Sequence, residues 1–157
     1  MAATEGRAAI ASAVAQHLGL SPQDTPNLVE AANLGYFDAT QGPVSILNMN
    51  SLRDLGDVLG AEVDPLRFRM NFYLEGVDAW SEMTWTKKRI RIGQTELHVT
   101  QKTGRCKATH VNPDTGDADI HMVRALKKNY GHTQFGIYAE VITGGPVQPG
   151  DEVQVVD

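Results

Sequence analysis

Six short stretches with the residue pattern of β-strands follow one another from Phe68 to the C-terminus. They alternate apolar and polar side chains or are rich in β-branched and aromatic residues. Explicit turn sequences such as NPDTG and PGD separate them. So many short strands in so little sequence predict a sheet that closes, or nearly closes, into a barrel. The expected strands cover 68–76, 88–93, 96–102, 107–111, 135–142 and 151–156, and a further buried strand is expected at 42–50.

The N-terminal segment is predicted to lie outside this sheet. Residues 4–20 carry apolar side chains at helical spacing, with Thr4 as a plausible N-cap and Gly19 as the stop. The SPQDTPN sequence that follows holds two prolines and several turn formers, and it reads as a connector. We therefore expect an N-terminal helix and connector over 1–27 and a β-rich domain over 28–157.

Two further helices are expected beside the strands. Residues 50–60 read as a helix that Asn50 or Ser51 caps, with Asp54 completing a capping box, and residues 122–130 read as another. Gly60 ends the first, and Gly131 directly follows the second. The predicted fold class is α+β and β-rich, a closed or partly open barrel with two or three flanking helices.

The chain has the length and composition of one ordinary domain that folds in water. Its 157 residues are 41% hydrophobic and 21% charged, which is far from the compositions of disordered or membrane chains. No apolar run approaches the roughly 20 residues that a membrane-spanning helix needs, and the N-terminus lacks the order of a secretory signal. A single cysteine forms no internal disulfide. We expect a cytoplasmic protein.

The only cysteine, Cys106, lies in the one basic segment of an acidic chain. The net charge is -5, which argues against general nucleic-acid binding, yet seven Lys and Arg residues and one Glu lie between Lys87 and Lys107. Arg105 and Lys107 flank the cysteine, and positive neighbours stabilise a thiolate, the form that binds soft metals or carries a persulfide. The alternative is a small buried hydrophobic residue.

Several longer stretches come in the order and spacing of one known family. They are PVSILNMNSLRDL, then DPLRFRMNFYLEG, then WTKKRIRIGQTELHVTQKTGRCKATHVNPDTGD, and finally FGIYAEVITGGPVQPGDEV. The second is similar to an Arg-Phe-Arg-Pro-Asn motif, with Met70 where the family commonly has proline. The third contains an Arg-Cys loop followed by a Val-x-Pro-x-Thr-Gly turn. With these features the chain resembles the MOSC domain family, named for the C-terminal part of molybdenum cofactor sulfurase.

The resemblance implies a barrel-like domain that binds molybdenum cofactor, or carries sulfur for it, through Cys106 as molybdenum ligand. In the amidoxime-reducing relatives, the domain reduces N-hydroxylated compounds with electrons from a partner protein. In the sulfurases it recognises the cofactor beside a separate PLP-dependent domain. No such domain fits in this chain, so PLP is not expected, and neither are haem or flavin. The partners implied are the cofactor and an electron-transfer or sulfur-donor protein, with no nucleic acid or membrane; the oligomeric state stays open.

The cofactor contacts expected from these motifs combine side-chain chemistry with family position. In a strand, Arg67 and Arg69 would share one face, and Arg69 would bind a phosphate or pterin oxygen with a fork of N-H groups, or simply lie in solvent. Ser51 would offer a helix N-terminus to a phosphate, although capping alone explains it. The full set expected to contact the cofactor is Arg69, Asn71, Ser51, Arg105, Lys107, Thr109 and Asn112.

Three functions remain open at this stage: a cofactor-handling protein, a molybdenum reductase, and a non-catalytic interaction or scaffold module. The third arises because larger relatives supply part of the pterin and phosphate site from a preceding segment, whereas an Ala-rich helix stands there in this chain. A zinc site is not expected, because Cys106 and His110 on one strand face, with His121 and His132 later, match no standard spacing. Trp80 and Trp85 are expected to be packing anchors.

Overall fold

The computed structural model describes residues 2–28 and 43–156, with side chains from Glu5 onward in the first range. Contacts divide the chain into two compact units, 1–36 and 37–157, which are described separately. The predicted boundary between residues 27 and 28 remains a prediction.

Within residues 2–28, the described part of the N-terminal unit, the one α-helix is α1, over Ala2–Leu18. It begins before Thr4, so the prediction that Thr4 caps it was wrong. The predicted end is confirmed, because Gly19 has φ of 63° and its N-H binds the carbonyl oxygen of Gln16. A single 3-10 turn, η1, follows over Pro22–Asp24 within the predicted connector.

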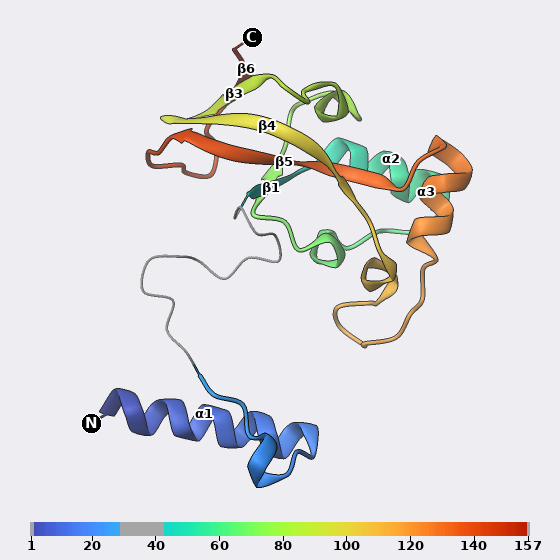
Figure 1. Cartoon of the computed structure of the whole chain (residues 1–157). Helices are drawn as coiled ribbons and strands as arrows, with labels where there is room; N and C mark the ends of the chain where they lie inside the picture. The colour runs from blue at the N-terminus through green and yellow to red at the C-terminus, as the bar shows by residue number, and fades with distance from the viewer. Residues whose placement is uncertain (1, 29–42, 157) are drawn as a thin grey trace. The chain divides into compact units, whose positions relative to one another are not determined.

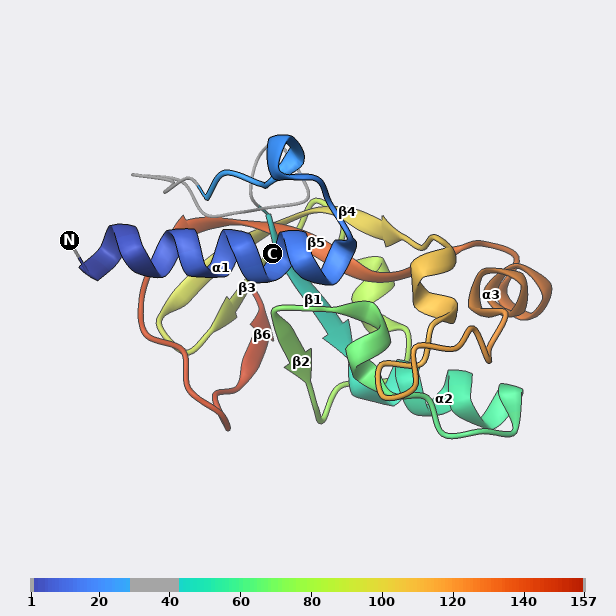
Figure 2. The same cartoon turned by 90° about the horizontal axis from the view of Figure 1, so that it is seen from below.

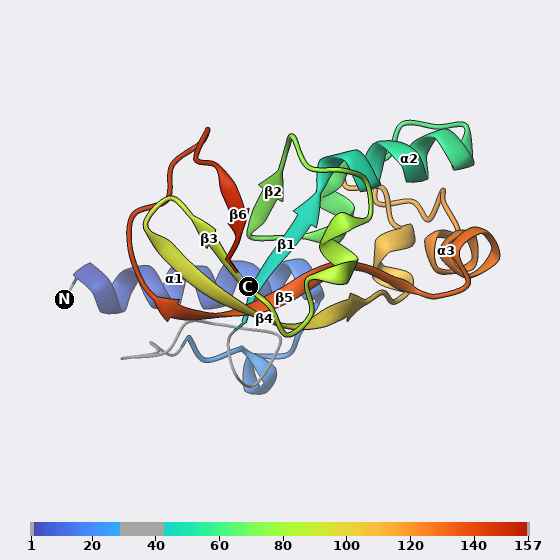
Figure 3. The same ribbon diagram turned by 90° about the horizontal axis from the view of Figure 1, so that it is seen from above.

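The described residues of the second unit, 43–156, are built on one sheet of six strands, which Figure 1 shows in part. Its order is β2-β1-β5-β4-β3-β6, with β1 and β2 parallel and every other pair antiparallel. The sheet curls into a partly open barrel, as the view in Figure 3 makes clear, and this confirms the predicted fold class. The strands are β1 (Val44–Asn48), β2 (Phe72–Leu74), β3 (Arg89–Ile92), β4 (Thr95–Gly104), β5 (Gln134–Thr143) and β6 (Val153–Val155).

Two helices lie together at one end of this sheet, as Figure 2 shows. Helix α2 covers Met49–Leu59 and α3 covers Met122–Tyr130, and each ends at a glycine in the left-handed region as predicted. The predicted cap of α2 was wrong, because Oδ1 of Asn48, not Asn50 or Ser51, accepts the free N-H of Asn50. Asp54 forms no capping box; it accepts hydrogen bonds from Trp80 and Tyr130 instead.

Two hydrophobic clusters fill the unit, one inside the curved sheet and one beneath the helices. Strand β1 serves both, since Ile46 packs into the first and Leu47 into the second, as alternation along a strand requires. Strand β5 also serves both, although Phe135 and Ile137 lie two residues apart and would normally share a face. The positive φ of Gly136, 80°, breaks the alternation between them.

Two of the predicted strands differ in the structure, each beside a 3-10 helix. The strand expected over 68–76 is reduced to β2, because Pro65 and the cap by Asp64 start the 3-10 helix η2 over Pro65–Phe68. Arg67 and Arg69 therefore do not share a strand face. The strand expected over 107–111 is the 3-10 helix η4 over Lys107–His110. A further 3-10 helix, η3, covers Ser81–Thr84.

Candidate functional site

Cys106 lies on an exposed corner between the end of β4 and the start of η4. Its thiol is free and exposed, so the alternative of a buried hydrophobic cysteine is wrong. The backbone around it is fixed: Oγ1 of Thr109 donates to the Cys106 carbonyl oxygen at 2.9 Å, and the N-H of Arg105 donates to the carbonyl oxygen of Thr133 at 2.9 Å. The corner therefore presents a sulfur atom from a defined backbone position.

The side chain of Arg105 turns inward, away from any ligand at the corner. Its Nε and Nη2 donate to the carbonyl oxygen of Phe135, at 2.8 and 2.5 Å, and its Nη1 donates to that of Phe68 at 3.3 Å. Nη2 also lies 3.0 Å from Sδ of Met70. Burial lowers the pKa of Arg105 to about 10. This guanidinium connects the corner to β5 and to the end of η2.

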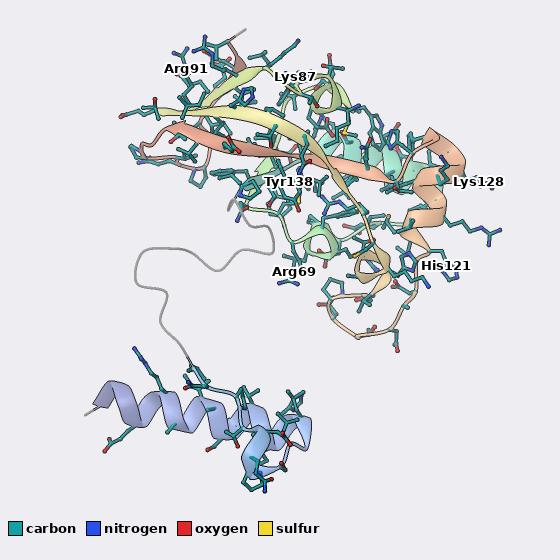
Figure 4. The ribbon with its side chains drawn as sticks, in the orientation of Figure 1. Arg69, Lys87, Arg91, His121, Lys128 and Tyr138 are labelled. Atoms are coloured by element: carbon teal, nitrogen blue, oxygen red, sulfur yellow. The ribbon has the colours of Figure 1, made fainter. Side chains whose placement is uncertain are left out.

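Arg69 is the exposed arginine of the pair predicted from the family motif. It ends η2 with φ of 50°, its backbone N-H donates to the carbonyl oxygen of Leu66, and its side chain makes no hydrogen bond or ion pair with any residue in the described ranges. Figure 4 shows it on the opposite side of the sheet from Lys87 and Arg91. Asn71, two residues later, uses its Oδ1 to accept hydrogen bonds from the N-H and hydroxyl of Ser45, at 2.9 and 2.8 Å. Its amide oxygen thus connects β2 to β1.

Ser51 is completely buried inside the fold. Its hydroxyl donates to the carboxylate of Glu82, with its oxygen 2.8 Å from Oε1, and accepts the N-H of Trp80 at 2.7 Å. Asn48 donates to the same carboxylate at 2.8 Å. Burial raises the pKa of Glu82 above its ordinary value. This network holds η3 against α2, and Ser51 has no exposed surface for a ligand.

The turn after the cysteine is held by a buried arginine. Arg67 binds both carboxylate oxygens of Asp119, at 2.7 and 2.8 Å, and also the carbonyl oxygen of His110 at 3.0 Å. Asn112 donates to Asp119 at 2.9 Å and starts the predicted turn. These hydrogen bonds lower the pKa of Asp119 to about 2. Of the two arginines in the family motif, Arg67 is therefore the one whose side chain stabilises the fold.

The basic segment of the sequence does not form one basic surface. Lys87 and Arg91 lie near β3 (Figure 4), and Arg105 is turned inward. Lys107 lines a hollow with three cations that sequence reasoning missed, Arg124, Lys127 and Lys128 of α3. The available signal was the VRALKKNY sequence, in which these three cations fall on neighbouring turns of one helix.

The histidines do not assemble a metal site. Among the described residues, no group of three or more His, Cys, Asp and Glu side chains is placed to hold a metal ion. Nε2 of His110 accepts the N-H of Val123 at 3.3 Å, and its ring meets His121 edge-on. Burial lowers the pKa of His110. His132 stacks on Tyr130.

The tryptophans are packing residues, as predicted. Trp85 is buried in the cluster inside the sheet, and Trp80 packs on Tyr130 with ring centroids 4.2 Å apart. Within the described ranges, no helix has the length and apolar character needed to span a membrane.

Residues 21–154 match the family model described as MOSC domain. The chain is 31% identical over 140 residues to "Mitochondrial amidoxime reducing component 2" of Bos taurus, covering 82% of this chain and 40% of that protein. It is 33% identical over 100 residues to "Molybdenum cofactor sulfurase" of Caenorhabditis elegans, covering 61% of this chain and 14% of that protein. The chain thus spans about two fifths of the first relative and a smaller share of the second.

The fold is also similar to that of a solved structure. The crystal structure of YiiM from Geobacillus stearothermophilus superposes with a TM-score of 0.53 at 17% sequence identity, covering 73% of this chain and 54% of that chain. At this identity, the likeness concerns the fold alone.

Proposed function

Because this chain belongs to the MOSC domain family, we propose that it binds a molybdopterin-type molybdenum cofactor through the thiolate of Cys106. The cofactor would supply a sulfur-rich metal centre for oxygen-atom or sulfur chemistry. The observation that carries the proposal is the exposure of this thiol on a corner whose backbone is fixed. A soft thiolate is a suitable ligand for such a metal and can also carry a persulfide.

Arg69 is the residue best suited to bind an anionic group of the cofactor. Arg69 is exposed, close in sequence to the buried Met70 that Arg105 contacts, and no described residue pairs with it. A free guanidinium offers a fork of donors to a phosphate or pterin oxygen. Lys107, exposed beside the cysteine, would add charge at the same corner. Four other predicted residues would support cofactor binding indirectly, because they fix the backbone of the site. They are Arg105, Asn71, Thr109 and Asn112.

Two activities follow from the relatives' names, and both remain proposals. In the first, the domain is the cofactor-binding part of a molybdenum reductase of N-hydroxylated compounds, supplied with electrons by a partner protein. In the second, it handles sulfurated cofactor received from a sulfur-donor protein. We propose the cytoplasm as its location.

The test is the molybdenum content of the full chain produced together with the cofactor synthesis enzymes. We expect bound molybdenum in the unaltered protein and none in Cys106→Ala. Arg69→Gln should lower the content, whereas Arg91→Gln, the same charge change on an exposed arginine of β3, should leave it unchanged. Equal molybdenum in the unaltered protein and Cys106→Ala would overturn the proposal.

A non-catalytic interaction or scaffold module is the second candidate. The observation that favours it is that Ser51, Asn71, Arg105 and Asn112 all use side-chain polar groups in hydrogen bonds to other residues of the fold. This candidate predicts that Cys106 is alkylated readily in the native protein while no molybdenum is retained under any loading condition. Cofactor binding predicts instead that loading protects Cys106 from alkylation.

A further inference from the structure

A hollow of about 500 Å³ lies between α3 and the 3-10 helix that follows Cys106. Lys107 and His110 of η4 form one wall, four residues of α3 form the other, and Thr133 closes one end. Its volume is within the range of pockets that hold small organic molecules. It is separate from Arg69 and from the buried Glu82 network, neither of which lines it.

The rim of the hollow is strongly cationic. Arg124 and Lys128 lie one helical turn apart on α3, and Lys107 lies on η4. None of these three side chains forms an ion pair with any residue in the part of the chain that the structure describes. Lys127 is the fourth cation, and its Nζ donates to the carbonyl oxygen of Gly131 at 2.7 Å. No Asp or Glu lines the hollow, so these like charges repel one another until an anion enters.

The floor of the hollow is apolar. Val123 is half-buried there, and Arg124 and Lys127, whose side chains have long aliphatic stems, line the hollow with it. The one titratable ring in the wall, His110, already accepts the N-H of Val123 at its Nε2, so this nitrogen is occupied. A ligand suited to this surface carries an apolar body for the floor and a negative charge for the rim.

The hollow adjoins the backbone that positions Cys106. Lys107 directly follows the cysteine in the chain, and the carbonyl oxygen of Thr133 accepts the N-H of Arg105, the residue before it. A molecule in the hollow would therefore contact Lys107, directly after the cysteine, and Thr133, which holds the backbone of Arg105.

We propose that this hollow is a binding site for an amphiphilic organic anion, such as an aromatic carboxylate or sulfonate. The cationic rim binds the anionic group, and Val123 with the neighbouring stems packs against the apolar body. This site goes beyond the proposed cofactor function, because its lining residues bind the anion without metal and without Cys106.

The test uses 2-naphthalenesulfonate as the probe, titrated into the isotope-labelled full chain and followed by NMR. We expect saturable shifts centred on the amides of Val123 and Thr133. The double variant Arg124→Gln/Lys128→Gln should weaken binding about tenfold, as two partly screened charge contacts allow. The matched double variant Lys87→Gln/Lys88→Gln removes the same charge from exposed lysines near β3 and should bind as the unaltered protein does.

Two further ligands separate the contributions of charge and apolar packing. The neutral 2-naphthalenemethanol and inorganic sulfate should each bind more weakly than 2-naphthalenesulfonate. Equal weakening by both double variants would mean a general charge effect and would overturn the proposal. So would sulfate binding as tightly as the aromatic sulfonate, or shifts that never saturate. Cys106→Ala should bind the probe normally, which distinguishes this site from the cofactor site.

Discussion

The guanidinium of Arg105 donates twice to the carbonyl oxygen of Phe135, from Nε at 2.8 Å and from Nη2 at 2.5 Å. Phe135 lies at the start of β5, and Arg105 directly precedes the exposed Cys106. The corner that carries the thiol is thus attached through one side chain to a central strand of the sheet.

Arg105→Met should destabilise the protein by about 2–4 kcal/mol, because it leaves the carbonyl oxygens of Phe135 and Phe68 without their charged donor. Urea unfolding followed by circular dichroism measures this loss. The control is Arg124→Met, an exposed arginine without an ion pair among the described residues, which should change stability by less than about 0.5 kcal/mol. Equal stability of the two variants would contradict the structural role of Arg105.

Gly136→Ala should destabilise the protein by about 2–4 kcal/mol. An added Cβ would lie 2.6 Å from the carbonyl oxygen of Ile46 and 2.7 Å from Cε of Met70, at a backbone φ of 80°. Thermal unfolding checks this. In the control Gly144→Ala, the new methyl group meets nothing within 4 Å, so the unfolding temperature should hardly move. Similar shifts for both glycines would count against the tight contact.

Glu82 should make the protein less stable as the pH rises above the ordinary carboxyl value of 4.5. Burial raises its pKa in the folded state, so the folded protein holds a proton that the unfolded chain has released, and stability falls until the folded pKa is passed. Glu82→Gln should remove this fall. The stability of the variant relative to that of the unaltered protein should therefore increase as the pH rises from acidic to neutral. Urea unfolding across the pH range measures it; parallel curves for the two proteins would refute the effect.

Asp119 should make the protein more stable as the pH rises, which is the opposite of the effect of Glu82. Its hydrogen bonds with Arg67 and Asn112 lower its pKa from 3.8 to about 2 in the folded state, so the unfolded chain takes up the proton first. The stabilisation is present above about pH 4 and is lost as the pH falls toward about 2. Asp119→Asn should be less stable at neutral pH and should flatten this acid limb. Asp114→Asn, in the same turn but without a cationic partner among the described residues, should keep the limb.

The sequence predicted the regular parts of the fold because their signals are local. Helix α3 was placed at its observed bounds, since its apolar spacing ends at Gly131. Strands β3, β4 and β5 follow from alternation between recognisable turns. Among the strands, the failures were the 3-10 segments around Phe68 and Ala108, where four residues are too few to distinguish a short helix from a short strand.

The site residues named from the sequence remain predictions, and the sequence did not indicate how their side chains are arranged. The exposure of Cys106 agrees with a functional thiol, yet the sequence predicted a cofactor contact for Arg105 and for Arg69 alike. Only the three-dimensional packing separates them, since one guanidinium is turned inward onto Phe135 and the other remains in solvent. The cations of α3 join Lys107 through tertiary contact alone, which no local pattern could reveal.

The pairing of Ile46 with Ile137 joins the first strand of the sheet to the next-to-last one in the chain. Almost the whole second unit must therefore be synthesised before β1 can find its antiparallel neighbour. Closing so long a loop is slow compared with forming the β3–β4 hairpin. During refolding, the amides of the β3–β4 hairpin should accordingly be protected from hydrogen exchange early and those of β1 late. The cysteine corner is anchored to β5, so it should reach its final structure in the later step.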